Sequence, residues 1–312
     1  MVDKWEKFVR RIADQGYTVY VTGSNARMLS SEIAAVLGGR FVIRQIFPLS
    51  FSEYLQVNGF DRTDKNILYS KRTEIIKTFS TYFQYGGVPE VLLVSDKREW
   101  LSNLFQKLYF GDLISRYQIR NDFALKILIR KLAESIKQPM SYNRIANVVS
   151  ASGKKISTDT VIDYLAYLKE MWLIFGIENI NARLAEKESN KKYYFTDNGI
   201  LNLFLTDPKT SLLENLVAIT LKQYYGDDVY YYQNGVEVDF YVLNEKLAIQ
   251  ACYSLSDETT RKRETNALIK LAKQLETSKM QIITYDESET IQIDNYQIEV
   301  IPVWRWLLNE SK

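Results

Sequence analysis

Two spacings of apolar residues alternate along this chain. Runs with apolar or β-branched residues at every second position are typical of strands, and runs with apolar residues every three or four positions are typical of helices that bury one face. Near the N-terminus the pattern predicts a strand over residues 18–22, a helix from Ser30 to Gly38-Gly39, and a strand over residues 41–49. Strand–helix–strand order predicts a parallel α/β sheet, because the helix returns the chain to the starting edge.

Polar and Pro-containing stretches divide the rest of the chain. An S-x-x-E capping box at Ser50 and Glu53 predicts a helix start, and the polar residues that follow it mark a boundary. Beyond it come a helical part interrupted by Gly86-Gly87-Val88-Pro89, then three helices and two strands around a charged loop at 181–191, and last a helix, three strands, a helix, a strand, a hairpin and a terminal helix. We expect an α/β multidomain protein with four domains, over residues 1–60, 61–122, 123–205 and 206–312.

Composition excludes several classes of chemistry. The chain has 312 residues, no histidine and one cysteine, so Ser-His-Asp catalysis, His-ligated zinc and an internal disulfide are excluded. Its 40 Lys and Arg against 38 Asp and Glu produce no strong overall field, and any nucleic-acid binding would need a local patch. The longest apolar runs are too short for a bilayer span, and no signal peptide is visible. We expect a cytoplasmic protein without membrane contact.

The string TGSNARML, followed by LGGRFVIRQIFPLSFSEYL, resembles the region after the Walker B strand in AAA-type (AAA+) P-loop ATPases of bacteria and archaea. More narrowly, it is similar to the subgroup with a C-terminal nuclease-like domain. The resemblance implies that Asn25 is a sensor-1-like residue, which helps orient the attacking water. It also implies that Arg40 is an arginine-finger-like residue, which stabilises developing phosphoryl charge and, acting in trans, indicates a homo-oligomer. From spacing alone, Asn25 is a turn residue and Arg40 a solvated cation.

The phosphate-binding motif of that family is missing. A P-loop needs G-x-x-x-x-G-K-[ST], and the nearest string, Ser152-Gly153-Lys154-Lys155, has Val148 in place of the first Gly. No acidic pair ends an apolar strand before Tyr17 either. We expect the phosphate-binding half upstream of Met1, ATP and Mg²⁺ in the complete protein, and no ATP turnover by this chain alone.

The next two parts also carry family resemblances. GGVPEV followed by LYFGDLISRYQIRN resembles the helical lid of the same ATPases, over residues 61–122. Residues 123–205 resemble a winged helix-turn-helix, whose third helix could enter a major groove with its leading residues Lys154, Lys155, Thr158 and Thr160. The part has only 12 Lys and Arg against 8 Asp and Glu. The alternative is that it packs between its neighbours or binds protein.

The last part resembles the PD-(D/E)XK nuclease fold. There a helix carboxylate, an Asp and an E-x-K on the next strand surround Mg²⁺ and the attacking water, and here Glu214 and Asp239 match the first two. The E-x-K position reads Gln250-Ala251-Cys252, so an anionic ligand and the lysine are replaced. We expect a degenerate domain without hydrolysis. From their positions alone, Glu214 is a surface or capping carboxylate and Asp239 a strand-edge residue.

Together these observations predict the C-terminal portion of an AAA-type ATPase that couples nucleotide hydrolysis to remodelling of a DNA or protein partner. A non-enzymatic DNA- or protein-binding module that acts through the winged helix is the alternative, and a metal-dependent nuclease is the third hypothesis.

Overall fold

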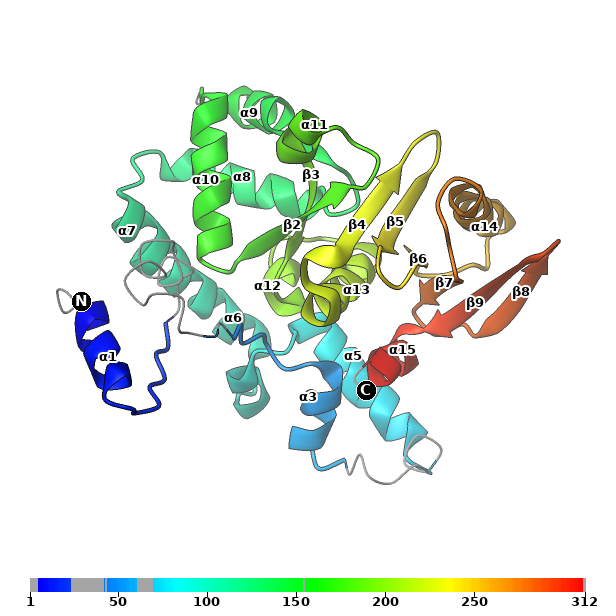
Figure 1. Ribbon diagram of the computed structural model, residues 1–312, viewed down its shortest axis with the longest axis horizontal. Coiled ribbons are helices and arrows are strands. Elements are labelled where there is room, and N and C mark those ends of the chain that lie inside the picture. Colours follow the sequence, from blue (N-terminus) through cyan, green and yellow to red (C-terminus); the bar gives the residue numbers. More distant parts are fainter. Residues whose placement is uncertain (1–4, 24–41, 43, 61–69, 154, 311–312) are drawn as a thin grey trace.

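A nine-stranded mixed sheet runs through the molecule in the order β1-β3-β2-β4-β5-β6-β7-β9-β8 (Figure 1). The computed structural model describes residues 5–23, 42, 44–60, 70–153 and 155–310. The pairs β2–β4, β6–β7 and β7–β9 are parallel and the others antiparallel. The strands are β1 Met140–Ser141, β2 Ile174–Asn179, β3 Asn190–Phe195, β4 Val229–Gln233, β5 Glu237–Val242, β6 Leu247–Ala251, β7 Lys279–Thr284, β8 Glu289–Ile293 and β9 Tyr296–Pro302.

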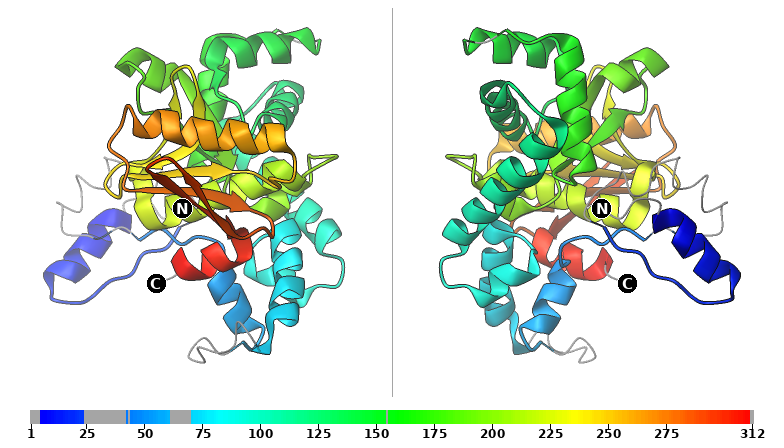
Figure 2. Two further views of the ribbon diagram at one scale, coloured as in Figure 1. Left: turned by 90° about the vertical axis from the view of Figure 1, so that its right-hand side faces the viewer. Right: turned by 90° about the vertical axis from the view of Figure 1, so that its left-hand side faces the viewer.

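Helices cover both faces of this sheet (Figure 2). One face packs under α14 Glu258–Ala272, and a larger apolar core on the other side joins α13 Lys209–Tyr225 to most of the remaining helices. These remaining helices are α3 Phe51–Val57, α5 Arg72–Tyr85, α6 Lys97–Gln106, α7 Ser115–Tyr117, α8 Asp122–Glu134, α9 Tyr142–Ala151, α10 Thr158–Glu170, α11 Leu184–Ser189, α12 Asn198–Asn202 and α15 Val303–Glu310. Two 3₁₀ turns, η2 Pro89–Leu93 and η4 Gly226–Asp228, and a π-helix, η3 Lys107–Ile114, complete the set.

Local sequence signals explain where the helices begin. The capping box at the start of α3 is confirmed: Glu53 N donates to Ser50 Oγ at 3.3 Å, and Ser50 N donates to Glu53 Oε2 at 2.8 Å. Ser157 caps α10 in the same way, since its Oγ accepts from Thr160 N at 3.1 Å. These bonds satisfy amides that have no partner inside the helix.

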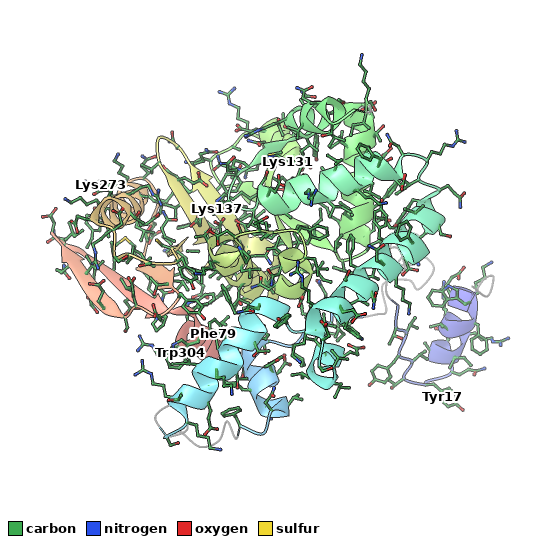
Figure 3. All side chains as sticks on the ribbon, turned by 180° about the vertical axis from the view of Figure 1, so that it is seen from behind. Tyr17, Phe79, Lys131, Lys137, Lys273 and Trp304 are labelled. Atoms are coloured by element: carbon green, nitrogen blue, oxygen red, sulfur yellow. The ribbon has the colours of Figure 1, made fainter. Side chains whose placement is uncertain are left out.

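The expected N-terminal parallel unit is not found among the described residues. Residues 17–23 and 44–50 are irregular instead of strands, and Tyr20 is 88% exposed. A strand needs a neighbour for its N–H and C=O groups, and none of the nine strands pairs with these segments. The helix predicted from Ser30 to Gly38-Gly39 lies outside the described residues. Helix α1, Trp5–Asp14, has no buried residue, and Figure 3 shows Tyr17 apart from the core that holds Phe79 and Trp304.

The two strand-rich parts share the one sheet. Strand β2, from the predicted domain 123–205, pairs in parallel with β4, from the predicted domain 206–312, at Glu178–Tyr230 and Asn179–Tyr231. The ladder continues with Ile180 N donating to Tyr231 O at 2.9 Å. The predicted boundary at residues 205 and 206 therefore separates segments whose main chains are hydrogen-bonded side by side.

The charged loop expected at 181–191 contains helix α11, Leu184–Ser189, and the first residues of β3. The expectation of a loop was therefore wrong for most of this segment. Its Leu, Ala, Glu and Lys residues have high helix propensity, and it contains neither Gly nor Pro, so high charge alone did not indicate a loop.

Candidate functional site

A buried lysine lies where the nuclease-like residues meet. The side chain of Lys192 on β3 is fully buried, and its Nζ lies 3.3 Å from Glu214 Oε1, 2.7 Å from Glu237 Oε1 and 3.2 Å from Asp239 Oδ1. An ammonium has three donors, so each can meet one carboxylate. We call Lys192, Glu214, Glu237 and Asp239 the lysine–carboxylate centre.

Strand alternation and helix packing bring these groups together. Glu237 and Asp239 are two residues apart on β5 and therefore point to the same side of the sheet. Lys192 and Tyr194 share a side of β3 for the same reason, and the Tyr194 hydroxyl donates to Glu214 Oε1 at 2.9 Å. Glu214 itself is on α13, which packs on β3 and β5. A buried charge is tolerated only when it is paired and hydrogen-bonded, which this arrangement achieves.

The centre shifts the proton equilibria of its members. Burial lowers the pKa of the Lys192 ammonium, but Glu214, Tyr194, Asp239 and Glu237 together outweigh it and raise that pKa well above its ordinary value. Burial, and after it the charge of Asp239, raises the pKa of Glu214 to about 8. Lys192 and Tyr194 both donate to Oε1 of Glu214.

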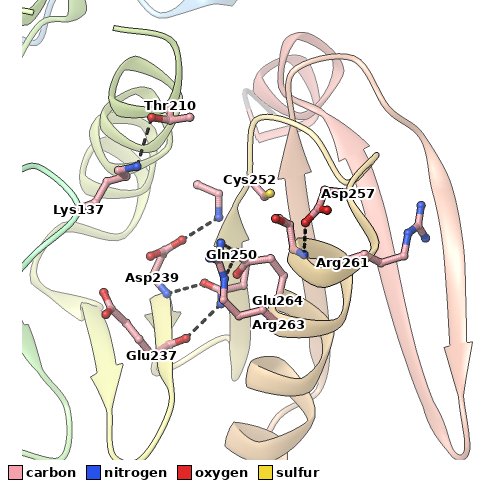
Figure 4. Close-up of polar contacts among 12 residues, drawn as sticks. Lys137, Thr210, Glu237, Asp239, Gln250, Cys252, Asp257, Arg261, Arg263 and Glu264 are labelled. Atoms are coloured by element: carbon pink, nitrogen blue, oxygen red, sulfur yellow. Dashed lines mark hydrogen bonds and ion pairs between the residues drawn. The ribbon is translucent and has the colours of Figure 1, made fainter. Parts of the chain in front are cut away.

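The two residues at the expected E-x-K position take no part in a metal shell. Gln250 bridges to β5 with both ends of its amide: Oε1 accepts from Asp239 N at 2.9 Å, and Nε2 donates to Glu237 O at 3.1 Å (Figure 4). Cys252 is buried, and burial raises the pKa of its thiol to about 11, so it stays neutral. Both side chains fill structural positions.

Mg²⁺, which the nuclease resemblance implies, does not fit this centre. Lys192 contacts an oxygen of all three carboxylates at 2.7–3.3 Å, and the second oxygen of Asp239 accepts from Ala251 N at 3.0 Å. Mg²⁺ needs oxygens at about 2.0–2.1 Å, where the ammonium already stands. Within the described ranges, no group of three or more Cys, Asp or Glu side chains is arranged to hold a metal ion.

A second polar cluster joins the N-terminal segment to the body. Leu49 N donates to Gly87 O at 2.8 Å, and Gly87 N donates to Asp197 Oδ2 at 2.8 Å. A Cβ on Gly86 would lie 2.1 Å from Asp197 Oδ1, and one on Gly87 would lie 2.1 Å from Leu49 O, so glycine permits both approaches. Burial raises the pKa of Asp197 to about 6, although the amides of Gly87, Ile200 and Gly199 oppose the shift. We call this contact the Gly87–Asp197 junction.

The junction continues toward the lysine–carboxylate centre through two buried asparagines. Asn198 Nδ2 donates to Phe83 O and to Leu212 O, both at 3.0 Å. Asn215, next to Glu214 on α13, donates to Asn198 Oδ1 at 2.9 Å and exchanges two hydrogen bonds with the main chain of Phe195. Bonds between buried polar groups therefore tie α5, α12, α13 and β3 together.

The expected DNA-contact residues are largely engaged in shaping the start of α10. Thr158 Oγ1 donates to Asn143 Oδ1 at 2.8 Å, and Thr160 Oγ1 lies 2.9 Å from the Ser157 hydroxyl. Lys155 is exposed, and Lys154 lies outside the described residues. The next exposed positions on α10 are Asp159, Ile162 and Asp163, so this surface is acidic and apolar from Asp159 onward.

Asn25 and Arg40, the sensor-1-like and arginine-finger-like residues, lie outside the described residues. The partly open cavity at the Gly87–Asp197 junction has a volume of about 10 Å³, which is close to the space of one water molecule. In the part of the chain that the structure describes, no helix combines the length and apolarity needed to cross a bilayer.

Comparison with known proteins connects these parts. Residues 1–55 match a family model described as an AAA domain, residues 76–211 match a domain of unknown function (DUF8612), and residues 209–306 match a domain of unknown function (DUF4143). An uncharacterized protein of Methanocaldococcus jannaschii, MJ1544, is 33% identical over 321 residues, which cover 98% of this chain and 72% of that protein. This chain belongs to the same family, which is related to AAA-type ATPases.

A second member of this AAA-related family comes from Haemophilus influenzae. This uncharacterized protein is 30% identical over 317 residues, which cover 98% of the chain and 75% of the relative. No solved structure matches the chain. The AAA match confirms the relation to ATPases predicted from the sequence, and the large mixed sheet with helices confirms the α/β class.

Sequence reasoning missed three members of the site: Lys192, Glu237 and Tyr194. Strands were predicted in both parts of the chain that carry these residues, so the missing information was the pairing between strands. One signal was available: Lys192 is the first residue of the run Lys192-Tyr193-Tyr194-Phe195, where a charged residue on a buried strand indicates an internal partner.

Proposed function

We propose that this chain is the effector portion of an AAA-type ATPase: residues 1–55 belong to the nucleotide-hydrolysing module, and the body from residue 70 onward transmits its motion to a bound protein. In the complete protein, hydrolysis of ATP assisted by Mg²⁺ would supply the energy for this motion. Asn25 would have the sensor-1-like role, and Arg40 the finger-like role across a homo-oligomer. The AAA match supports the assignment of the first part. Because no P-loop string occurs in the sequence, this chain alone is expected not to release phosphate from ATP.

The observation that carries the proposal is the continuous sheet across residues 140–302. The order α8, β1, α9, α10, β2, β3, with β1–β3–β2 antiparallel, supports a winged helix. The order α13, β4, β5, β6, α14, β7 supports a nuclease-like domain. The two parts are joined where β2 pairs with β4 and where Lys192 of the first part contacts Glu214 of the second. These contacts support one rigid body. A rigid body can move as a lever when its N-terminal attachment moves.

We propose that the nuclease-like part has lost hydrolysis. The carboxylates that would hold Mg²⁺ contact Lys192, and Gln250 is bonded to the β5 main chain. No group remains in the E-x-K position to stabilise an attacking water.

A protein partner is favoured over DNA by the charge of α10. Phosphates are attracted by clustered Lys and Arg, and the exposed surface of α10 beyond Lys155 carries Asp159 and Asp163 beside the apolar Ile162. An acidic rim around an apolar residue suits a basic, partly apolar protein surface. DNA binding through the start of α10 is the second candidate, and Lys155 is the described residue that supports it.

Hydrogen exchange followed by mass spectrometry tests the one-body proposal. Amides of β2 and β4 are expected to exchange together, at the rate of global unfolding. Separate opening of residues 122–195 while 209–306 stays protected would refute it. Phosphate release from ATP and Mg²⁺ above the buffer rate would refute the expected inactivity of the isolated chain.

Fluorescence anisotropy with a labelled DNA duplex tests the choice of partner. We expect the duplex not to bind in the salt-sensitive manner that is typical of phosphate recognition. Tight, salt-sensitive binding that is reduced by Lys155→Ala and unchanged by Lys262→Ala, an exposed lysine on α14, would transfer the function to DNA recognition.

A further inference from the structure

The lysine–carboxylate centre joins opposite charges from the two parts of the body. The cation comes from β3, in the winged-helix part, and the three carboxylates come from α13 and β5, in the nuclease-like part. Lys192 and Glu214 are buried almost completely, whereas Glu237 is 38% exposed and Asp239 16% exposed. Solvent therefore reaches the edge of the centre at β5 but not the ammonium.

The geometry of the centre matches an ammonium better than a divalent ion. The three oxygens lie 2.7, 3.2 and 3.3 Å from Nζ, which are hydrogen-bond distances. Ca²⁺ binds oxygens at about 2.3–2.6 Å and Mg²⁺ at about 2.0–2.1 Å, so either ion would have to draw the carboxylates inward. Tyr194 and the main chain of Ala251 hold two of these carboxylates in their present places.

We propose that the Lys192 ammonium is the resident cation of this centre: it takes the position of the catalytic metal, and it locks the winged-helix part onto the nuclease-like part. Because the cation is covalently attached to β3, it is present at every divalent-ion concentration, and a free ion cannot bind without displacing it. The centre thus keeps the carboxylates of a nuclease but uses them for docking. This inference deepens the proposed function and rests on its one-body arrangement.

A direct consequence is that removing the ammonium uncovers a divalent-cation site. Lys192→Ala deletes the only cation found within salt-bridge distance of Glu214, Glu237 and Asp239 among the described residues, and it leaves space where a partly hydrated ion can enter. Like charges confined together strongly favour a cation, and oxygen ligands suit Mn²⁺, Ca²⁺ and Mg²⁺.

The experiment compares wild type, Lys192→Ala and Lys192→Ala combined with Asp239→Asn. Each is titrated with Mn²⁺, and its Tm is measured with and without about 10 mM Mn²⁺, since a ligand that binds only the folded state raises Tm. We expect one Mn²⁺ bound and a higher Tm for Lys192→Ala alone. An equal response of the wild type, or no response of Lys192→Ala, would overturn the proposal.

A measurement on the wild type covers the case in which the variant does not fold. Acetylation by an amine-reactive reagent, followed by mass spectrometry, reports how often each ammonium is free. Lys192 is expected to react only at the rate of global unfolding, and Lys262 on α14, whose side chain is 69% exposed, at once. Comparable rates would show that the ammonium leaves the carboxylates in the native state and would refute the lock. Hydrogen exchange at β2 and β4 remains a separate test of the one-body arrangement. The one-body proposal and the Lys192 proposal can therefore fail independently.

Discussion

A single methyl group at Gly87 is expected to weaken the attachment of the N-terminal segment to the body. In Gly87→Ala the new Cβ would lie 2.1 Å from Leu49 O and 3.1 Å from both Leu49 C and Leu49 N, all of which are main-chain atoms. Ordinary contact begins at 3.4 Å, so Leu49 must retreat by about 1.3 Å. A side chain could rotate away from the methyl, but this backbone is held between Ser50, which caps α3, and the junction.

The magnitude follows from the bonds that this retreat breaks. Leu49 N donates to Gly87 O at 2.8 Å, and the Tyr82 hydroxyl donates to Leu49 O at 3.0 Å. Each bond contributes about 0.5–1.5 kcal/mol, and a buried group left without a partner loses about 1–3 kcal/mol. We expect Gly87→Ala to lower the free energy of unfolding by about 2–4 kcal/mol.

Equilibrium unfolding in urea, followed by tryptophan fluorescence, measures this loss, because Trp304 and Trp306 are buried on α15, which contacts α3. Gly111→Ala is the matched control: a Cβ at Gly111 meets nothing within 4 Å, so alanine should be neutral or stabilising by about 0.5–1 kcal/mol. If Gly87→Ala is as stable as Gly111→Ala, the close approach of Leu49 is not present and the reasoning fails.

Four other substitutions probe the buried polar groups. The folded pKa of Glu214, about 8, lies above its ordinary 4.5, so the folded state binds the extra proton between these values and wild-type stability falls as pH rises through that window. Thermal melts of Glu214→Gln should show a shallower fall from acidic to alkaline pH, and parallel curves would contradict the shift. Asn215→Leu leaves the main chain of Phe195 and the Asn198 carbonyl without partners, so urea unfolding should show a loss of about 2–4 kcal/mol; a loss under about 1 kcal/mol would count against the network. Lys192→Met should lose about 3–5 kcal/mol in the same assay but Glu237→Gln only about 1 kcal/mol, because Glu237 is partly exposed, and equal losses would argue against the burial gradient.

Local signals were sufficient for much of the secondary structure. Ser50 with Glu53 predicted a helix start that the hydrogen bonds confirm. The hairpin predicted before the terminal helix is formed by β8 and β9, with Asp294 at φ +50°. Such signals act within a few residues, so the sequence displays them directly.

The alternation of apolar and polar residues predicted a strand wrongly where no neighbouring strand was available. Residues 18–22 have strand-like composition, yet the described structure leaves them irregular, with Tyr20 exposed. Propensity for extended backbone is realised only when another strand accepts the hydrogen bonds. Gln250 illustrates the opposite case, since its side chain supplies bonds to β5 that no local pattern indicates.

The sequence by itself determined the α/β class, the relation to AAA-type ATPases, the positions of Glu214 and Asp239, and the replacement of the E-x-K residues by Gln250 and Cys252. These depend on residue identity and short-range spacing. Only the tertiary structure placed Lys192 among the carboxylates and joined β2 to β4. Lys192 lies 22 residues from Glu214 and 47 from Asp239. The meeting of such distant groups is decided by how strands pair and helices pack, because only the packing of β3, β5 and α13 brings their side chains within hydrogen-bond distance.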